Sequence, residues 1–169
     1  MNVNSVLDIL QGFANPAAGA AKGSWIVAHG SPMQDFRIED KRFPNRHDLD
    51  RVVPDHPVSI SFGAHVTIAN TPALSAAKIT RDTPDPAGGH IRHDPQTGEP
   101  TGELHERAQL IVKKVAPEFN YLQLKDGIVF ALDQCLQRGV TTVHDIVRYA
   151  EPVRAYQELY KEGRMHARV

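Results

Sequence analysis

The stretch LQLKDGIVFALDQCLQRGVTTVHDIVRYAEPVRAYQELYKEGRMHARV, residues 122–169, decides the fold class. Its apolar residues recur at helical spacing over 122–138 and again over 152–162, and a glycine follows each run. Runs at 140–143 and 165–169 come after those glycines and predict strands. Helices that alternate with strands are typical of a parallel sheet, so we expect an α/β fold.

The sequence before this stretch predicts shorter elements. Helical spacing of apolar residues or a capping residue indicates helices at 5–13, 70–78 and 105–114, and a brief helical turn at 45–52. Short apolar runs predict strands at 24–28 and 58–62. Two further strands, 90–93 and 101–104, flank the turn sequence DPQTGEP and predict a hairpin in which Gly98 takes a positive φ.

Length and composition limit the function classes. The chain has 169 residues and a mass of 18.7 kDa, whereas a complete (β/α)8 barrel needs about 250 residues. The 19 Lys and Arg residues balance 20 Asp and Glu residues, which argues against nucleic acid or an anionic membrane as a partner. No apolar run is long enough to span a membrane. We therefore expect a soluble protein. The single Cys135 cannot form an intrachain disulfide, which fits the cytoplasm, the expected compartment, and equally fits a periplasmic protein without disulfides.

Three stretches resemble a known family. They are PNRHDLDRVVPDHPVSISFGAHVTIANTPAL at 44–74, ITRDTPDPAGGHIRHDPQTGEPTGELHERA at 79–108, and QRGVTTVHD at 137–145. Together they resemble the amidohydrolase superfamily, in particular its YtcJ-like branch, which includes N-substituted formamide deformylases. The resemblance runs from Trp25 to the last residue and implies a metal-dependent (β/α)8 hydrolase barrel.

The resemblance also implies how the chain is organised. Residues 1–169 are expected to form a single incomplete barrel segment of about three βα units. Residues 82–117 are expected to be an insertion within it, made of a loop, a β-hairpin and a short helix. Aligned by motif, the chain begins after the first barrel strand and stops where the fourth forms, so it looks like an internal segment of a longer enzyme.

The resemblance implies the reaction and its cofactor as well. The family hydrolyses non-peptide C–N bonds of small amide or formamide substrates, using water activated by a divalent metal such as Zn, Fe or Mn. Its ligands include an HxH pair, and no HxH occurs in this sequence. We therefore expect this chain alone to bind no metal and to be inactive.

Five residues are candidates for the site. His65 and Asn70 match a GH and a following Asn of the family, and His144 with Asp145 ends a predicted strand, where barrel enzymes place catalytic groups. His65, His144 and Asp145 are predicted to be catalytic, with Asp145 orienting the histidines. Asn70 and Glu106 are predicted to contact substrate. Alternatively, Asn70 and Asp145 cap helices, His65 caps a loop, and Glu106 occupies a solvated helix N-terminus.

Other functions stay open at this point. The chain could be a non-catalytic remnant, or one subunit of a split barrel that works only with a complementary chain. Unpaired barrel edges would then favour self-association. A metal-binding domain built from His90, His93 and His105 is a third alternative, but the hairpin would point His90 and His93 to opposite faces. Cys135 lies on an apolar helix face, which indicates a core residue and not a nucleophile.

Overall fold

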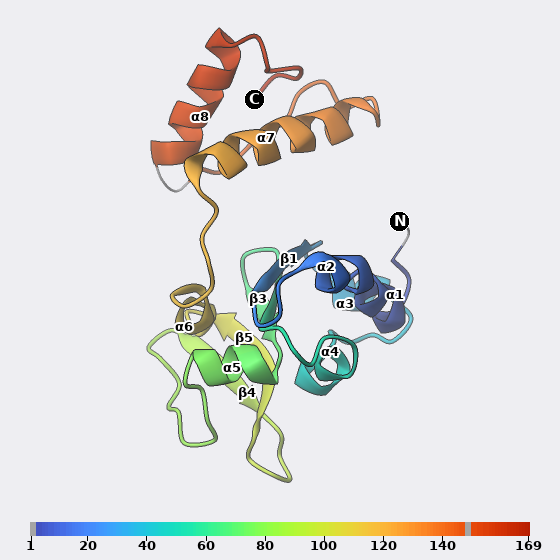
Figure 1. Ribbon diagram of the computed structural model, residues 1–169, viewed down its shortest axis with the longest axis vertical. Coiled ribbons are helices and arrows are strands. Elements are labelled where there is room, and N and C mark those ends of the chain that lie inside the picture. The colour runs from blue at the N-terminus through green and yellow to red at the C-terminus, as the bar shows by residue number, and fades with distance from the viewer. Residues whose placement is uncertain (1–2, 148–149) are drawn as a thin grey trace. The chain divides into compact units, whose positions relative to one another are not determined.

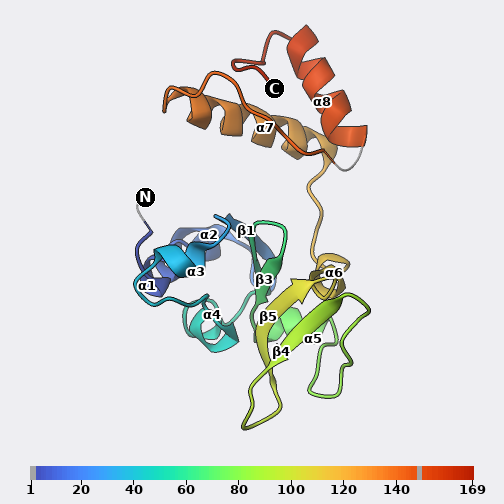
Figure 2. The same cartoon turned by 180° about the vertical axis from the view of Figure 1, so that it is seen from behind.

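The computed structural model describes residues 3–147 and 150–169 of the chain (Figures 1 and 2). It divides into two compact units, Met1–Pro117 and Glu118–Val169, and each is described by itself. No helix among the described residues is long and apolar enough to cross a bilayer.

The first unit is built on one mixed sheet. Among the described residues the sheet has five strands in the order β1-β2-β3-β5-β4. β1 runs parallel to β2, and the other neighbouring pairs are antiparallel. The strands are β1 Ile26–Gly30, β2 Val58–Phe62, β3 Val66–Ala69, β4 Gly89–His93 and β5 Pro100–Glu106. The α/β class is therefore confirmed, although only one strand pair of this sheet is parallel.

The helices of the first unit begin where the sequence offers a cap. Ser5, Asn45 and Asn70 each accept a hydrogen bond from a first-turn N–H, which satisfies a group with no partner inside the helix. These caps begin the helices predicted at 5–13 and 70–78 and the helical turn predicted at 45–52. The helices are α1 Val6–Gln11, α2 Ala14–Gly19, α3 Gln34–Arg37, α4 Arg46–Val52, α5 Thr71–Ala76 and α6 Gln109–Lys113.

Two hydrophobic clusters hold these elements together. The first joins α1 and α4 to β1, β2 and β3, and its fully buried members include Ile38, Leu49, Val58 and Ile68. The second joins α5 and α6 to β4 and β5, with Ile91, Leu104 and Val112 fully buried. The sheet therefore carries apolar side chains that helices cover, the usual arrangement of a layered α/β domain.

Two predictions about the first unit need correction. β3 was not predicted; it pairs with β2 after a three-residue loop in which Gly63 has a φ of +64°. The helix predicted at 105–114 is shorter than expected, because β5 continues to Glu106 by pairing with β3 and β4. Tertiary strand pairing has overridden the local helical pattern at its start.

The second unit contains α7 Tyr121–Leu136 and α8 Ala150–Lys161. The buried ammonium of Lys125 on α7 binds the carboxylates of Glu158 and Glu162 from α8 or just beyond it. Both helices match the predicted ranges. The strands predicted at 140–143 and 165–169 are wrong as extended strands: they reduce to a single parallel bridge between Thr142 and Arg168. A two-stranded pair is marginal in water, which accounts for the short pairing.

Candidate functional site

The first unit brings His65 and Glu106 together. The His65 Nδ1 lies 2.8 Å from the Glu106 Oε1, although 41 residues separate them in sequence. His65 ends the β2–β3 loop, and Glu106 ends β5. Because Val66 pairs with His105, the residue before Val66 and the residue after His105 meet at one end of the ladder. A carboxylate only accepts, so the His65 Nδ1–H donates, and in the neutral ring Nε2 is then the acceptor nitrogen.

The backbone that carries His65 and Glu106 is strained at Glu106, and hydrogen bonds hold it in place. Glu106 has a φ of +48°, a left-handed conformation that costs a residue other than glycine about 1–3 kcal/mol. Its N–H donates to the His65 carbonyl at 2.9 Å. The side-chain amide of Gln109 donates to the carbonyls of Ala64 at 2.8 Å and Glu106 at 3.1 Å. Backbone strain of this kind clusters at functional sites.

Sequence reasoning did not identify Gln109 as a site residue. It is 2% exposed, and its Oε1 accepts a hydrogen bond from the Thr67 hydroxyl at 2.8 Å. Its contacts reach residues more than 40 positions away, so no local pattern signals them. Only the fold reveals its role.

A cleft of about 910 Å³ adjoins His65. Its walls come from the segment 32–45 and from the ends of β2 to β5, and they include Phe43, Phe62, His93 and His105. The rings of Phe43 and Phe62 lie 4.7 Å apart, and the His93 Nε2 is buried with no hydrogen-bond partner among the described residues. Most of the lining residues are polar or charged, so the cleft offers many hydrogen-bonding groups and is less apolar than a typical small-molecule site.

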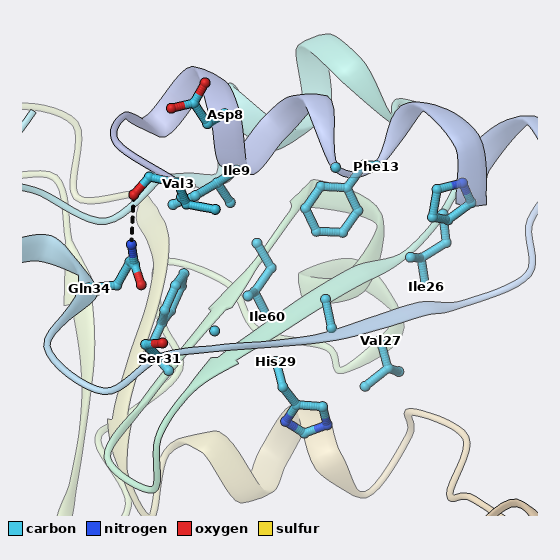
Figure 3. A pocket seen from close by; sticks show the side chains of 15 residues that line it. Val3, Asp8, Ile9, Phe13, Ile26, Val27, His29, Ser31, Gln34 and Ile60 are labelled. Atoms are coloured by element: carbon cyan, nitrogen blue, oxygen red, sulfur yellow. Dashed lines mark hydrogen bonds between the residues drawn. The ribbon is translucent and has the colours of Figure 1, made fainter. Parts of the chain in front are cut away.

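A second cavity in this unit contains none of the five predicted residues. It measures about 390 Å³ and lies between α1 and the β1–β2 side of the sheet (Figure 3). Ile9, Phe13 and Ile60 line it, while the His29 side chain points away from the helix. The lining is mainly apolar, so the cavity offers little chemistry for hydrolysis.

Asn70 caps α5, as the alternative interpretation predicted. Its Oδ1 accepts from the N–H groups of Val58 at 2.8 Å and Ala73 at 3.1 Å. Its Nδ2 donates to the carbonyls of Val53 and His56. All four hydrogen-bonding positions are used and the side chain is fully buried. Substrate contact by Asn70 stays a prediction that these bonds do not favour.

His144 and Asp145 belong to the second unit, in the segment that follows the parallel bridge. The Tyr156 hydroxyl donates to the Asp145 Oδ2 at 2.7 Å. Burial, together with this bond, raises the pKa of Tyr156 to about 12. His144 is exposed, and both residues border a groove of about 540 Å³ along α7. In the second unit Asp145 is therefore hydrogen-bonded to Tyr156, and in the first unit His65 is hydrogen-bonded to Glu106.

The donor groups present do not fit the metal site that the resemblance implies. Three further histidines each face one carboxylate: His90 with Asp85, His105 with Glu103, and His166 with Asp133. Across 3–147 and 150–169, no three His, Cys, Asp or Glu side chains form a group that could hold a metal ion. His90, His93 and His105, which lie within these ranges, are therefore not gathered into such a group.

Comparisons with known proteins agree on one relationship. The sequence profile described as "Amidohydrolase family" matches residues 1–169. The YtcJ protein of Bacillus subtilis, which is named as an amidohydrolase, is 33% identical over 92% of this chain and 30% of its own length. The N-substituted formamide deformylase of Arthrobacter pascens is 29% identical over 85% of this chain and 27% of its own length.

Two solved structures have a similar fold. A metal-dependent hydrolase from Pyrococcus horikoshii aligns with 98% of this chain and 30% of its own length, with a TM-score of 0.51 and 21% identity. One from Pyrococcus furiosus gives a TM-score of 0.52 at 21% identity. The chain thus spans about 30% of the length of these relatives.

Proposed function

The chain belongs to the amidohydrolase family, and on that premise we propose that it forms part of a metal-dependent hydrolase of non-peptide C–N bonds in small amides or formamides. The observation that carries the proposal is the family match over the whole chain, which covers about 30% of the YtcJ relative. In such an enzyme a divalent metal (Zn, Fe or Mn) supplies the activated water. We assign metal ligation to residues outside this sequence, because the donor groups of the described residues form no cluster that could hold a metal ion.

We further propose that the chain supplies about three βα units of a (β/α)8 barrel. The parallel pairing of β1 with β2 and the parallel Thr142–Arg168 bridge support this assignment. Residues 82–117 would then be the inserted region, since they contain the antiparallel hairpin of β4 and β5 and the short helix α6.

His65 is the residue to which we assign substrate contact. Its exposed Nε2 can accept a hydrogen bond from a substrate N–H while Nδ1–H donates to Glu106. An imidazole that carries a proton on Nε2 can donate it to the developing oxyanion of the substrate carbonyl, while Nδ1–H donates to the Glu106 carboxylate. Glu106 then orients His65, and we assign a second polar contact with substrate to His144, oriented by Asp145.

The test places this chain in a complete enzyme. In a chimera, this chain replaces the matching residues of the Arthrobacter deformylase. Hydrolysis of N-substituted formamides by the chimera is then measured with Zn, Fe or Mn added. We expect hydrolysis by the chimera and none by the 169-residue chain alone. His65→Gln in the chimera should lower kcat/KM about a hundredfold, as loss of one oxyanion donor does.

The matched control is His47→Gln, since His47 is exposed and does not line the cleft. It should leave kcat/KM unchanged. Stoichiometric metal and hydrolysis in the isolated chain would overturn the proposal that the ligands lie elsewhere. Equal activity of the His65→Gln and His47→Gln chimeras would overturn the role of His65.

A further inference from the structure

We propose that Gln109 is a positioning residue that holds His65 against Glu106. The inference rests on the proposed function of His65 for its catalytic meaning, but the contact itself can be tested without activity. The Gln109 side chain donates to carbonyls of the two backbone segments that carry the imidazole and the carboxylate.

The His65–Glu106 pair cannot hold its own geometry. The side chains are 75% and 58% exposed, and an ion pair or hydrogen bond this open to water contributes little, because solvent screens it and ordering two side chains costs entropy. His65 ends a loop, and Glu106 occupies the left-handed region. The pair therefore depends on how firmly the two backbone segments are fixed.

Gln109 fixes both segments with one amide. Its Nε2 carries two protons, and these go to the carbonyls of Ala64 and Glu106, one from each segment. Since the side chain is buried, these bonds face no competition from water. The Glu106 carbonyl that accepts one of them belongs to the residue with the unusual φ, so the same amide supports the strained turn.

A buried hydroxyl fixes the orientation of the amide. The Thr67 hydroxyl donates to the Gln109 Oε1 at 2.8 Å and lies 3.1 Å from the Ser61 Oγ. Lys113 also donates to that oxygen, at 3.4 Å. With the oxygen held on this side, the NH₂ group must face the two carbonyls. Thr67 thus belongs to the same network but touches neither segment of the pair.

The experiment is ¹⁵N NMR of the imidazole rings in the full 169-residue chain at about pH 8.5, where ordinary imidazoles are neutral. His65→Gln assigns the ring signals by subtraction. In the wild type we expect the His65 Nδ1 to resonate as a protonated nitrogen that donates to Glu106. We also expect slow exchange of the Gln109 side-chain amide protons, a readout that requires no substitution.

Two variants separate positioning from stability. Gln109→Met keeps the size and removes both donors, so the His65 Nδ1 signal should shift toward that of an unprotonated nitrogen. Gln109→Glu keeps the acceptor for Thr67, loses the donors, and should shift the same signal. The control is Ser5→Ala, which removes the N-cap of α1 and lowers stability at a site that has no hydrogen bond to Gln109, so it should leave the His65 signal unchanged.

An unshifted His65 signal in folded Gln109→Met or Gln109→Glu, or fast exchange of the Gln109 amide protons in the wild type, would overturn the inference. A failure of the proposed function would give a different result in these experiments. If both Gln109 variants shift the His65 signal while Gln109→Met in the deformylase chimera keeps full kcat, Gln109 positions the pair and His65 has no part in catalysis.

Discussion

Buried polar residues connect segments that are far apart in the first unit. Asn70 is the clearest case, because it caps α5 and also bonds Val58 in β2 and His56 in the segment before that strand. Removing such a side chain leaves buried N–H and C=O groups without partners, at a cost of about 1–3 kcal/mol for a group left unsatisfied.

Asn70→Ala should therefore lower the free energy of unfolding by about 3 kcal/mol, more than loss of a cap alone. Urea denaturation of the full chain measures this change. Asn45→Ala is the matched control: Asn45 also caps a helix, α4, through bonds to the N–H groups of His47 and Asp48. Asn45→Ala should lower the free energy of unfolding by about 1 kcal/mol. Equal losses for the two variants would mean that the bonds of Asn70 to Val58 and His56 contribute nothing.

Asp48 should make the stability of the chain depend on pH. Burial raises the pKa of its carboxyl, but hydrogen bonds from Arg42, the Asn45 N–H and Arg51 outweigh burial, so the pKa lies below its ordinary value of 3.8. Because the pKa of this carboxyl is lower in the folded state than in the unfolded state, its ionised form stabilises the protein at pH values above the ordinary pKa. That stability is lost as the pH falls through the folded-state pKa.

The unfolding free energy measured from about pH 7 down to about pH 3 tests this linkage. Asp48→Asn should be less stable than the wild type near neutral pH, and the two curves should converge as the carboxylate is protonated. Asp82→Asn, in an exposed loop, should follow the wild type throughout. A constant difference between Asp48→Asn and the wild type would contradict the assignment.

At the scale of the element, β5 depends on a glycine where it meets β3. Gly102 has a φ of +94°, and a Cβ there would lie 2.2 Å from the Ala69 carbonyl oxygen. Both the left-handed backbone and the close approach of the neighbouring strand exclude a side chain. The strand that ends in Glu106 is thus built around a position that only glycine tolerates.

Gly102→Ala should destabilise the first unit by about 4 kcal/mol, the sum of backbone strain and overpacking. Gly98→Ala provides the comparison, because Gly98 has a φ of +72° in the β4–β5 turn, but a Cβ there would meet no neighbouring side chain or strand within 4 Å. It should cost about 1 kcal/mol. Thermal unfolding of both variants checks this order, and the reverse order would refute the steric explanation.

At the scale of the whole molecule, β1 is an edge strand of the sheet of the first unit, since in the part of the chain that the structure describes it pairs with β2 alone. The Ile26 N–H donates toward β2, to the Pro57 carbonyl. In a parallel ladder alternate residues face alternate sides, so the Val27 N–H points to the open edge. An edge of unpaired N–H and C=O groups is a template for another strand, which is the basis for proposing self-association or a complementary chain.

Val27→Pro should weaken self-association without unfolding the sheet, since it removes a donor that faces outward. Ala28→Pro removes a donor that faces β2 and should unfold the first unit. Sedimentation velocity over a range of concentrations, with circular dichroism on the same samples, distinguishes the two effects. Association of Val27→Pro at wild-type strength would show that β1 is not the surface used.

The sequence by itself determined the elements whose signals are local. The helical spacing over 122–138 and 152–162 corresponds to α7 and α8, and the turn at Gly98 correctly predicts the β4–β5 hairpin. The family resemblance, carried by ordered motifs, is likewise confirmed by the match over residues 1–169. Such signals act over a few neighbouring residues or accumulate along the chain, so no knowledge of the fold is needed.

Only the tertiary structure decided which groups meet. It added β3, extended β5 to Glu106, and reduced the strands predicted at 140–143 and 165–169 to one bridge. His65 and Glu106 were each candidates, but their 2.8 Å contact follows from the register of β3 on β5. Gln109 had no local signal, because its partner Ala64 lies 45 residues away. Strand register depends on long-range packing, and so the site could be assembled only from the fold.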